Sequence, residues 1–280
     1  MDNALSRRSF VAGAVCFACA PLAVGGRTVK TPLMLDTKRM AIHDGPGIRT
    51  TFFVKGCSLH CVWCHNPESI STGRQLARFQ HLCARCKTCT MDEMTCPTRA
   101  LKFYGKPMTQ DEIVAKALED RPFYETSGGG VTLSGGEPLF FWEWTAELLK
   151  RFKAAGLHTC LDTSLYAPAA AIDAVLPFVD MWLPDYKADD DVLHEKYTGV
   201  SNRIIRTNLD RLVAAKAKLE VRCLVVPGLT DGEDLLARRR YLRQLGISDA
   251  SVVELEYHDL ARSKYLSLGL PDTMPPKKEI

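Results

Sequence analysis

Three cysteines at short spacing form the most reactive group of residues in the first third of the chain. They lie in "KGCSLHCVWCHNP" (residues 55–67) as Cys57, Cys61 and Cys64, with the spacing C-x3-C-x2-C. A closed structural metal site usually has four protein ligands, whereas a site that must bind substrate leaves one coordination position open. Three thiolates at this spacing therefore favour a 4Fe–4S cluster with one open iron.

A structural metal site remains an alternative for the same stretch. His60 and His65 stand beside the cysteines, and either one could supply a fourth ligand for zinc. The three cysteines alone do not decide between the two readings, so the elements around them have to be considered.

A second group of cysteines lies in "CARCKTCTMDEMTCP", where C-x2-C-x2-C is followed by a Cys-Pro pair. This pattern is similar to a ferredoxin-type iron–sulfur loop, although the spacing to the last cysteine is longer than in the common bacterial motif. Structural zinc is the alternative. The four cysteines are Cys83, Cys86, Cys89 and Cys96.

Short runs of β-forming residues alternate with helical patterns after residue 50. This alternation is typical of an α/β fold with a parallel sheet, and the mostly apolar runs predict strands covered on both faces. The runs are residues 50–55, 130–134, 158–162, 181–186, 220–226 and 251–257. The helical patterns are residues 109–118, 142–155, 168–176, 208–217 and 233–245.

Reactive or flexible residues follow each of the six predicted strands. The carboxyl ends of parallel strands meet at one edge of the sheet, so these residues should surround a single site. They are the Cys57, Cys61 and Cys64 group, Gly135-Gly136-Glu137, Asp162-Thr163, Asp185 with Lys187, Pro227-Gly228 after Arg222, and His258. This convergence favours the open cluster over the structural zinc site.

Length and charge set broad limits on the protein. A chain of 280 residues with 46% apolar residues can bury one sizeable core with a small insert. The net charge of +3 and the lack of a long basic run do not indicate a nucleic-acid partner. Near the N-terminus, Arg7 and Arg8 precede an apolar run that is too short to span a bilayer. Residues 1–30 are similar to a twin-arginine export signal, or form an extension without such a role.

From about Leu33 onward, the chain resembles the radical S-adenosylmethionine superfamily, and within it the glycyl-radical-enzyme activating enzymes related to pyruvate formate-lyase activating enzyme. The motifs that carry the resemblance are "IHDGPGIRTTFFVKGCSLHCVWCHNPES" (residues 42–69), "SGGGVTLSGGEPL" (residues 127–139), "LDTS", "DYK", "TGVSN" and "VVPG". The resemblance implies a partial (β/α)6 TIM-like barrel over residues 33–280, with a small ferredoxin-like iron–sulfur insert at residues 70–106.

The resemblance also assigns roles to individual residues. Cys57, Cys61 and Cys64 would hold the catalytic 4Fe–4S cluster, and S-adenosylmethionine would chelate its open iron. The four insert cysteines would hold one auxiliary cluster. Asp162, Thr163 and Asp185 resemble a site for a monovalent cation. The implied cofactor contacts are Trp63, His65, Gly135, Gly136, Glu137, Asp162, Thr163, Asp185, Lys187, Arg222 and His258.

The implied reaction is reductive cleavage of S-adenosylmethionine, followed by removal of a hydrogen from a backbone glycine of a large glycyl-radical enzyme. The cluster and the cofactor carry the chemistry, so no further catalytic side chain is expected. The implied electron donor is a flavodoxin or a ferredoxin. This chemistry belongs in the cytoplasm, whereas the leader would permit export. A radical enzyme acting on a small molecule and a non-catalytic iron–sulfur protein are the alternative functions.

Two features depart from the family pattern. Leu165 stands where the family often has glycine after "DTS", and the insert has one ferredoxin-like motif where many relatives have two. One auxiliary cluster is therefore the most that we expect this insert to bind.

Overall fold

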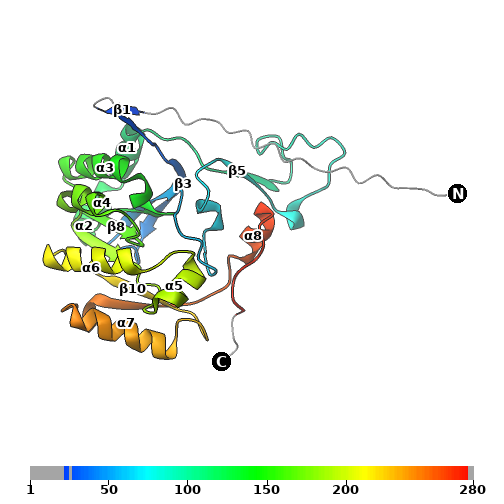
Figure 1. The fold of residues 1–280 in the computed structure, drawn as a ribbon. Coiled ribbons are helices and arrows are strands. Elements are labelled where there is room, and N and C mark those ends of the chain that lie inside the picture. Colours follow the sequence, from blue (N-terminus) through cyan, green and yellow to red (C-terminus); the bar gives the residue numbers. More distant parts are fainter. Residues whose placement is uncertain (1–21, 25–26, 277–280) are drawn as a thin grey trace.

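The computed structural model describes residues 22–24 and 27–276, and Figure 1 shows the arrangement of its elements. The proposed leader with Arg7 and Arg8 lies outside these residues, apart from the short antiparallel pair β1 (Leu22–Val24) and β2 (Arg27–Val29). Within the described part of the chain, no helix is long and apolar enough to cross a membrane.

Six parallel strands occupy the six runs predicted from the sequence. Four of them form a five-stranded sheet in the order β3-β4-β7-β8-β9, in which only β3 is antiparallel to its neighbour. The strands are β3 (Leu33–Ala41), β4 (Arg49–Lys55), β7 (Gly130–Gly135), β8 (Thr159–Thr163) and β9 (Met181–Pro184). The antiparallel strand β3 was not predicted, because it precedes the alternating pattern.

The last two parallel strands form a separate pair, β10 (Val221–Val225) and β11 (Val252–Glu256). Two isolated parallel bridges, Trp182 with Leu219 and Asp185 with Arg222, attach this pair to the end of β9. Among the described residues no pairing joins β11 back to β3, so the sheet is mainly parallel and is not closed.

Helices follow the strands and cover one side of the sheet, where α3, α4, α6 and α7 are stacked in Figure 1. The helices are α1 (Gln110–Leu118), α2 (Arg121–Ser127), α3 (Trp142–Ala154), α4 (Ala169–Val175), α5 (Asp191–Thr198), α6 (Arg203–Ala214), α7 (Gly232–Gln244) and α8 (Arg262–Leu268). Of these, α2, α5 and α8 were not predicted. Helix α6 begins five residues earlier than the predicted segment, because Ile205 is already buried in the core.

Local sequence explains where several helices begin and end. Thr109 and Glu112 form a complete capping box at the start of α1, as the sequence predicts. Gly156 adopts a left-handed conformation (φ 74°) just after α3, which suits a residue without a Cβ atom. The core between sheet and helices is apolar, with Phe52, Leu133 and Trp182 fully buried.

The cysteine-rich insert lies at the opposite side of the molecule from the stacked helices (Figure 1). An antiparallel hairpin of β5 (Gln75–Arg78) and β6 (Leu101–Tyr104) brackets it. Short 3-10 helices lie between the other elements, at Pro67–Ser69, Gln80–Leu82, Pro138–Phe141, Leu176–Phe178 and Asp249–Ser251.

Candidate active site

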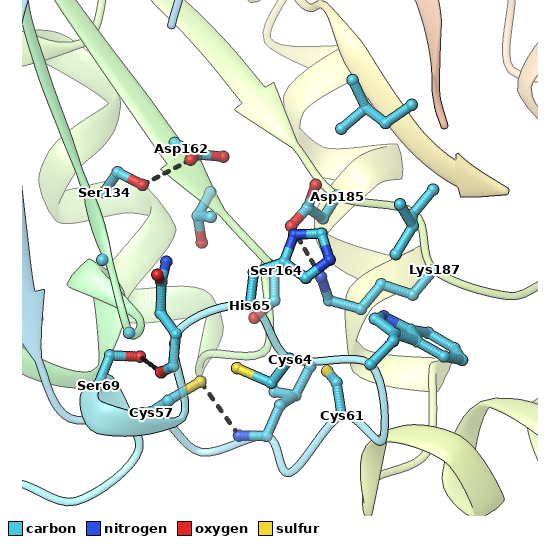
Figure 2. A pocket seen from close by; sticks show the side chains of 18 residues that line it. Cys57, Cys61, Cys64, His65, Ser69, Ser134, Asp162, Ser164, Asp185 and Lys187 are labelled. Carbon is cyan, nitrogen blue, oxygen red and sulfur yellow. Dashed lines mark hydrogen bonds and ion pairs between the residues drawn. The ribbon is translucent and has the colours of Figure 1, made fainter. Parts of the chain in front are cut away.

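A cavity of about 220 Å³ lies at the carboxyl ends of the parallel strands, where the sequence predicts the site. Figure 2 shows cysteine side chains on one side of it and the side chains of Asp162, Asp185 and Lys187 on the other. The predicted site residues that line it are Cys57, Cys61, Trp63, Cys64, His65, Gly135, Gly136, Asp162, Thr163, Asp185 and Lys187. Three further predicted cofactor contacts, Glu137, Arg222 and His258, do not line the cavity but contact residues that do.

The loop that carries the three cysteines is fixed by backbone hydrogen bonds on both sides. The N–H of Cys57 donates to the carbonyl of Ile70 at 3.1 Å, in the segment that follows the loop. The N–H groups of His60 and Val62 donate to the carbonyls of Thr198 and Tyr197, at 2.8 and 2.9 Å. The end of α5 therefore holds the middle of the loop, which explains why "TGVSN" belongs to the site although it does not line the cavity.

The three cysteines are half-buried and lie near one cationic group. Burial raises the pKa of Cys57 above its ordinary range and the pKa of Cys64 to about 12. The ammonium of Lys187 acts in the opposite direction on Cys61 and Cys64. Because thiolates are the ligands of iron, bound iron would supply the positive charge that stabilises them here. The donor set and its burial fit an iron–sulfur cluster.

Lys187 is paired with Asp185 across the cavity wall, with Nζ 2.7 Å from Oδ2. Burial by itself would lower the pKa of Lys187, but Asp185 and Cys61 raise it overall. The Lys187 side chain is only 15% exposed, so this pair is half-buried and is not a solvated surface pair. Its ammonium keeps a positive charge next to the cysteine loop.

The Gly135-Gly136 turn approaches strand β4 so closely that side chains do not fit. A Cβ atom on Gly135 would lie 2.3 Å from the backbone of Val54, and one on Gly136 would lie 2.3 Å from the carbonyl oxygen of Gly56. Gly135 also has a positive φ of 120°. Packing against β4 thus requires both glycines, and it places their backbone at the cavity beside the cysteine loop.

Glu137 stabilises this turn through hydrogen bonds to its neighbours. Its carboxylate accepts hydrogen bonds from the hydroxyl of Thr163 at 2.6 Å, the N–H of Ser164 at 2.8 Å and the N–H of Leu139 at 2.9 Å, as well as from the Ser164 hydroxyl. Burial raises the pKa of Glu137, and these hydrogen bonds oppose the shift. Glu137 therefore ties the end of β7 to the end of β8, and its role is structural support.

Asp162 is half-buried at the cavity and belongs to a group of polar side chains at the end of β8. Its Oδ2 accepts a hydrogen bond from Ser134 at 2.6 Å, and its Oδ1 lies 3.6 Å from the guanidinium of Arg222. Burial raises the pKa of Asp162 to about 6, which Arg222 partly counteracts. Arg222 also donates to the backbone carbonyl of His43 at 2.6 Å, so the "HDGPGIRT" loop is fixed to the interior of the sheet.

The histidines of the site divide into two groups. His65 lines the cavity and stacks on His258, with ring centroids 4.0 Å apart and an angle of 18° between the rings. His60, in contrast, is exposed near Gly199 and does not line the cavity. The structure therefore does not place His60 as a fourth ligand beside the cysteines.

Sequence reasoning missed the contribution of α8. Lys264 donates to the His65 carbonyl at 2.9 Å, to Asn66 Oδ1 at 2.9 Å and to Glu68 Oε1 at 2.7 Å. The hydroxyl of Tyr265 donates to the Cys64 carbonyl at 3.0 Å. These partners are about 200 residues apart in sequence, so no local pattern could indicate the contacts. Asn66, Ser69, Ser134 and Ser164 also line the cavity without having been singled out.

Leu165, which departs from the family pattern, adopts the left-handed conformation (φ 60°) that glycine adopts more readily. Its N–H donates to the Thr163 hydroxyl at 3.0 Å, and its carbonyl accepts from the Asn208 side chain at 2.9 Å. The side chain is fully buried in the core. Packing and hydrogen bonds therefore hold a conformation that costs about 1 kcal/mol for a residue other than glycine.

The insert cysteines surround a second, smaller cavity of about 90 Å³, lined by all four of them. Cys86 and Cys89 are exposed, whereas Cys83 and Cys96 are half-buried. Within the described residues, no group of three or more His, Cys, Asp or Glu side chains is placed to hold a single metal ion. The arrangement of the four cysteines around a common space is compatible with a multi-iron cluster, in which each iron takes one thiolate.

Comparisons with known proteins agree with this geometry. A family model described as "4Fe-4S single cluster domain" matches residues 43–183. The chain is 36% identical to the (2S)-3-sulfopropanediol dehydratase activating enzyme of Klebsiella oxytoca, over 86% of this chain and 87% of that protein. It is 33% identical to the benzylsuccinate synthase activating enzyme of Thauera aromatica, over 86% and 83% of the two chains.

A third relative is the choline trimethylamine-lyase activating enzyme of Oleidesulfovibrio alaskensis, which is 35% identical over 85% of this chain and 87% of that protein. Among solved structures, Streptococcus suis SuiB bound to the precursor peptide SuiA aligns with a TM-score of 0.51 and 12% identity. The alignment covers 76% of this chain and 39% of SuiB, and it concerns the fold alone.

Proposed function

Because the chain belongs to the radical S-adenosylmethionine family of activating enzymes for glycyl-radical enzymes, we propose that its cavity holds a 4Fe–4S cluster and S-adenosylmethionine side by side. The observation that carries this proposal is the convergence of Cys57, Cys61 and Cys64 with the Gly135-Gly136 turn and Lys187 in one cavity. When bound, these groups would supply one-electron reductive chemistry on the C5′–S bond of the cofactor, with the electron coming from an external reductant.

The residues of the protein would bind the cluster and the cofactor, orient them and shield them from water. Cys57, Cys61 and Cys64 are the proposed cluster ligands, and the exposed backbone of Gly135 and Gly136 is the proposed contact for the methionine ammonium. Trp63 is 3% exposed and packs against Tyr197, so it is a fixed wall suited to an adenine ring. Asp185, Lys187 and His65 complete the polar lining. His258 stacks on His65, and Arg222 forms an ion pair with Asp162.

A monovalent cation is proposed beside Asp162, Thr163 and Asp185. All three line the cavity, and the half-buried carboxylate of Asp162 forms an ion pair with Arg222 at 3.6 Å. A cation here would favour the ionised form of Asp162, whose pKa burial raises to about 6. The site thus has the oxygen ligands that a hard cation prefers.

The finer architecture is also a proposal. The bridges from β9 to β10 support a partial (β/α)6 barrel made of the six parallel strands, spanning residues 33–280. The β5–β6 hairpin supports a separate insert at residues 70–106, and the common cavity of its four cysteines supports one auxiliary cluster. Dependence on S-adenosylmethionine and on a flavodoxin or ferredoxin supports a cytoplasmic location, whatever the role of residues 1–30.

Isotope transfer from the partner tests the proposed function. The anaerobically reconstituted enzyme is supplied with S-adenosylmethionine, a chemical reductant and a candidate glycyl-radical enzyme labelled with α-deuterated glycine. We expect deuterium in the first 5′-deoxyadenosine released and a glycyl radical signal in the partner. Unlabelled 5′-deoxyadenosine, formed while a small molecule is converted efficiently, would contradict the proposal.

A further inference from the structure

The positive charge of the protein is concentrated in the cysteine-rich insert. Residues 70–106 contain seven Lys and Arg against two Asp and Glu, a net charge of +5, although the whole chain has a net charge of only +3. The remainder of the chain is therefore slightly acidic. The basic residues are Arg74, Arg78, Arg85, Lys87, Arg99, Lys102 and Lys106, and all except the half-buried Arg78 are exposed.

These basic side chains have no acidic partners in the part of the chain that the structure describes. None of the seven forms an ion pair there, whereas many arginines of the core do. The two acidic residues of the insert bind backbone instead. Glu93 accepts the N–H of Phe103 at 2.8 Å, and Asp92 accepts the N–H of Met94 at 3.1 Å. The charge of the insert is thus available to another molecule.

Exposed apolar side chains accompany this charge. Met94 is 89% exposed, Met91 46% and Leu82 43%, and all three lie in the segment that contains the four cysteines. Cys86 and Cys89 are exposed in the same segment. Methionine adapts its shape to different partners, and a few apolar contacts surrounded by charge are typical of transient protein interfaces.

The insert also lies next to the active-site loop. Lys102 and Tyr104 of β6 share a cavity of about 280 Å³ with Asn66, Glu68 and Lys264, which are residues of the active-site loop and of helix α8. Asn66 lines the active-site cavity as well. Strand β5 also contacts α8, so the base of the insert lies next to the active-site loop and α8.

We propose that the surface formed by Arg85, Lys87, Arg99, Met91 and Met94 docks a small acidic electron-carrier protein of the flavodoxin or ferredoxin class. This inference rests on the proposed function, which consumes one electron for each S-adenosylmethionine cleaved. The carrier is oxidised by one electron, and this protein is reduced by one. Charge complementarity would speed the encounter, because opposite charges steer diffusing proteins together.

The insert is less suited to the other macromolecules that bind basic surfaces. Single-stranded nucleic acid needs exposed aromatic rings for base stacking. In the insert, Tyr104 is buried, Phe79 is half-buried, and the half-buried ring of Phe103 is covered by Arg74, whose guanidinium carbon is 3.8 Å from the ring centroid. A glycyl-radical enzyme as the occupant is an outcome that the experiment distinguishes.

The experiment compares two triple variants of the reconstituted full chain. The test variant is Arg85→Glu, Lys87→Glu and Arg99→Glu. The control is Lys150→Glu, Lys218→Glu and Arg240→Glu, three exposed basic residues. They lie in α3, just after α6 and in α7, and these three helices lie away from β5 in Figure 1. Both variants have the same net charge, so only the position of the changed residues differs.

Binding of a purified acidic flavodoxin is measured by titration calorimetry at about 0.05 M and about 0.5 M salt, where screening differs strongly. We expect the test variant to bind at least about tenfold more weakly than wild type at low salt, with the difference shrinking at high salt. The control should bind within about threefold of wild type. Equal binding by the test variant, or an equal loss in the control, would overturn the docking surface.

Activity with two reductants separates this inference from the proposed function. With flavodoxin as donor, the test variant should release 5′-deoxyadenosine more slowly than wild type, whereas a small chemical reductant should drive both equally. If no protein releases 5′-deoxyadenosine with the chemical reductant, the proposed function fails while the binding result still decides the docking surface. If the test variant also activates the glycyl-radical enzyme poorly with the chemical reductant, the surface belongs to that enzyme and the inference is wrong.

Discussion

The core of the molecule and its cysteine-rich insert differ in how their polar groups are paired. In the core, the buried carboxylate of Glu137 accepts hydrogen bonds from residues at the ends of two strands, and Arg238 donates to the carbonyls of Tyr186 and Leu224 at 3.1 Å. In the described residues of the insert, the four cysteines are not bonded to one another and the seven basic residues form no ion pairs.

This difference indicates where each region obtains its order. Hydrogen bonds within the chain hold Glu137, Asp162 and Lys187 at the active site. In the insert, Cys83 accepts a hydrogen bond from Arg78 at 3.1 Å, but Cys86 and Cys89 are exposed and the four cysteines are free. We therefore expect the order of the insert to depend more on a bound metal cluster than that of the core does. The following predictions test this comparison, from the largest expected effect to the smallest.

The largest effect should come from a cluster ligand in the core. Cys61→Ala should remove the iron of the active-site cluster and abolish formation of 5′-deoxyadenosine, because the cluster needs each of its three thiolates. Iron analysis and anaerobic product assays measure this. Cys223→Ala is the matched control, since Cys223 is buried in β10 away from the cavity. Retained 5′-deoxyadenosine formation by Cys61→Ala would refute the assignment.

Glu137→Gln should strongly destabilise the core of the site. A glutamine has one acceptor oxygen where the carboxylate has two, so the side-chain NH2 group would face the donors from Thr163, Ser164 and Leu139. We expect a loss of about 2–4 kcal/mol in the free energy of unfolding, measured by denaturant titration. The exposed Glu147→Gln should change it by less than about 0.5 kcal/mol. Wild-type stability of Glu137→Gln would show that the bracing is not needed.

Changes in the insert should leave the core intact. Cys83→Ser with Cys86→Ser should reduce the iron content to about half, from about eight to about four irons per chain, because only one of two clusters is lost. The melting temperature of the core and cleavage driven by a chemical reductant should stay near wild type. Zinc bound to the insert of the unchanged protein would favour the structural-zinc alternative. Unfolding of the core in the double variant would contradict the idea that the core is independent of the insert.

The smallest effect concerns an ion pair at the edge of the core. Asp120 is buried and accepts hydrogen bonds from the Arg39 Nε at 2.9 Å and the Thr50 hydroxyl at 2.6 Å. The hydrogen bond from Arg39 lowers the pKa of Asp120. Asp120→Asn should cost about 1–2 kcal/mol at neutral pH, which is modest because the Arg39 side chain is 45% exposed.

The effect of this variant should depend on pH. A lowered folded-state pKa means that the ionised carboxylate stabilises the native state above its unfolded pKa of about 3.9, and that this stability is lost as the pH falls through the folded value. The difference in unfolding free energy between wild type and Asp120→Asn should therefore be largest near pH 6. It should shrink as the pH falls below about 4. Denaturant titrations across this range test it, and a gap that persists in acid would contradict the ion-pair explanation.

Much of the fold was predictable from local patterns. The six parallel strands coincide with the six apolar runs, and the capping box of α1 was readable from Thr109 and Glu112 alone. Helices α2, α5 and α8 were missed because they bury few apolar side chains and so show no regular apolar pattern. Their buried residues are Tyr124 in α2, His194 and Thr198 in α5, and Tyr265 and Ser267 in α8. The antiparallel edge strand β3 also escaped prediction, since it has no helix between it and β4.

The sequence by itself determined the proposed chemistry of the site, because the spacing of Cys57, Cys61 and Cys64 and the Gly-Gly-Glu turn are local features of the chain. Only the tertiary structure decided which residues support that chemistry. Lys264 and Tyr265 fix the backbone after Cys64, and the insert's charge is unpaired because no acidic side chain is placed against it among the described residues. Such contacts arise from the packing of distant segments, which short-range sequence patterns do not encode.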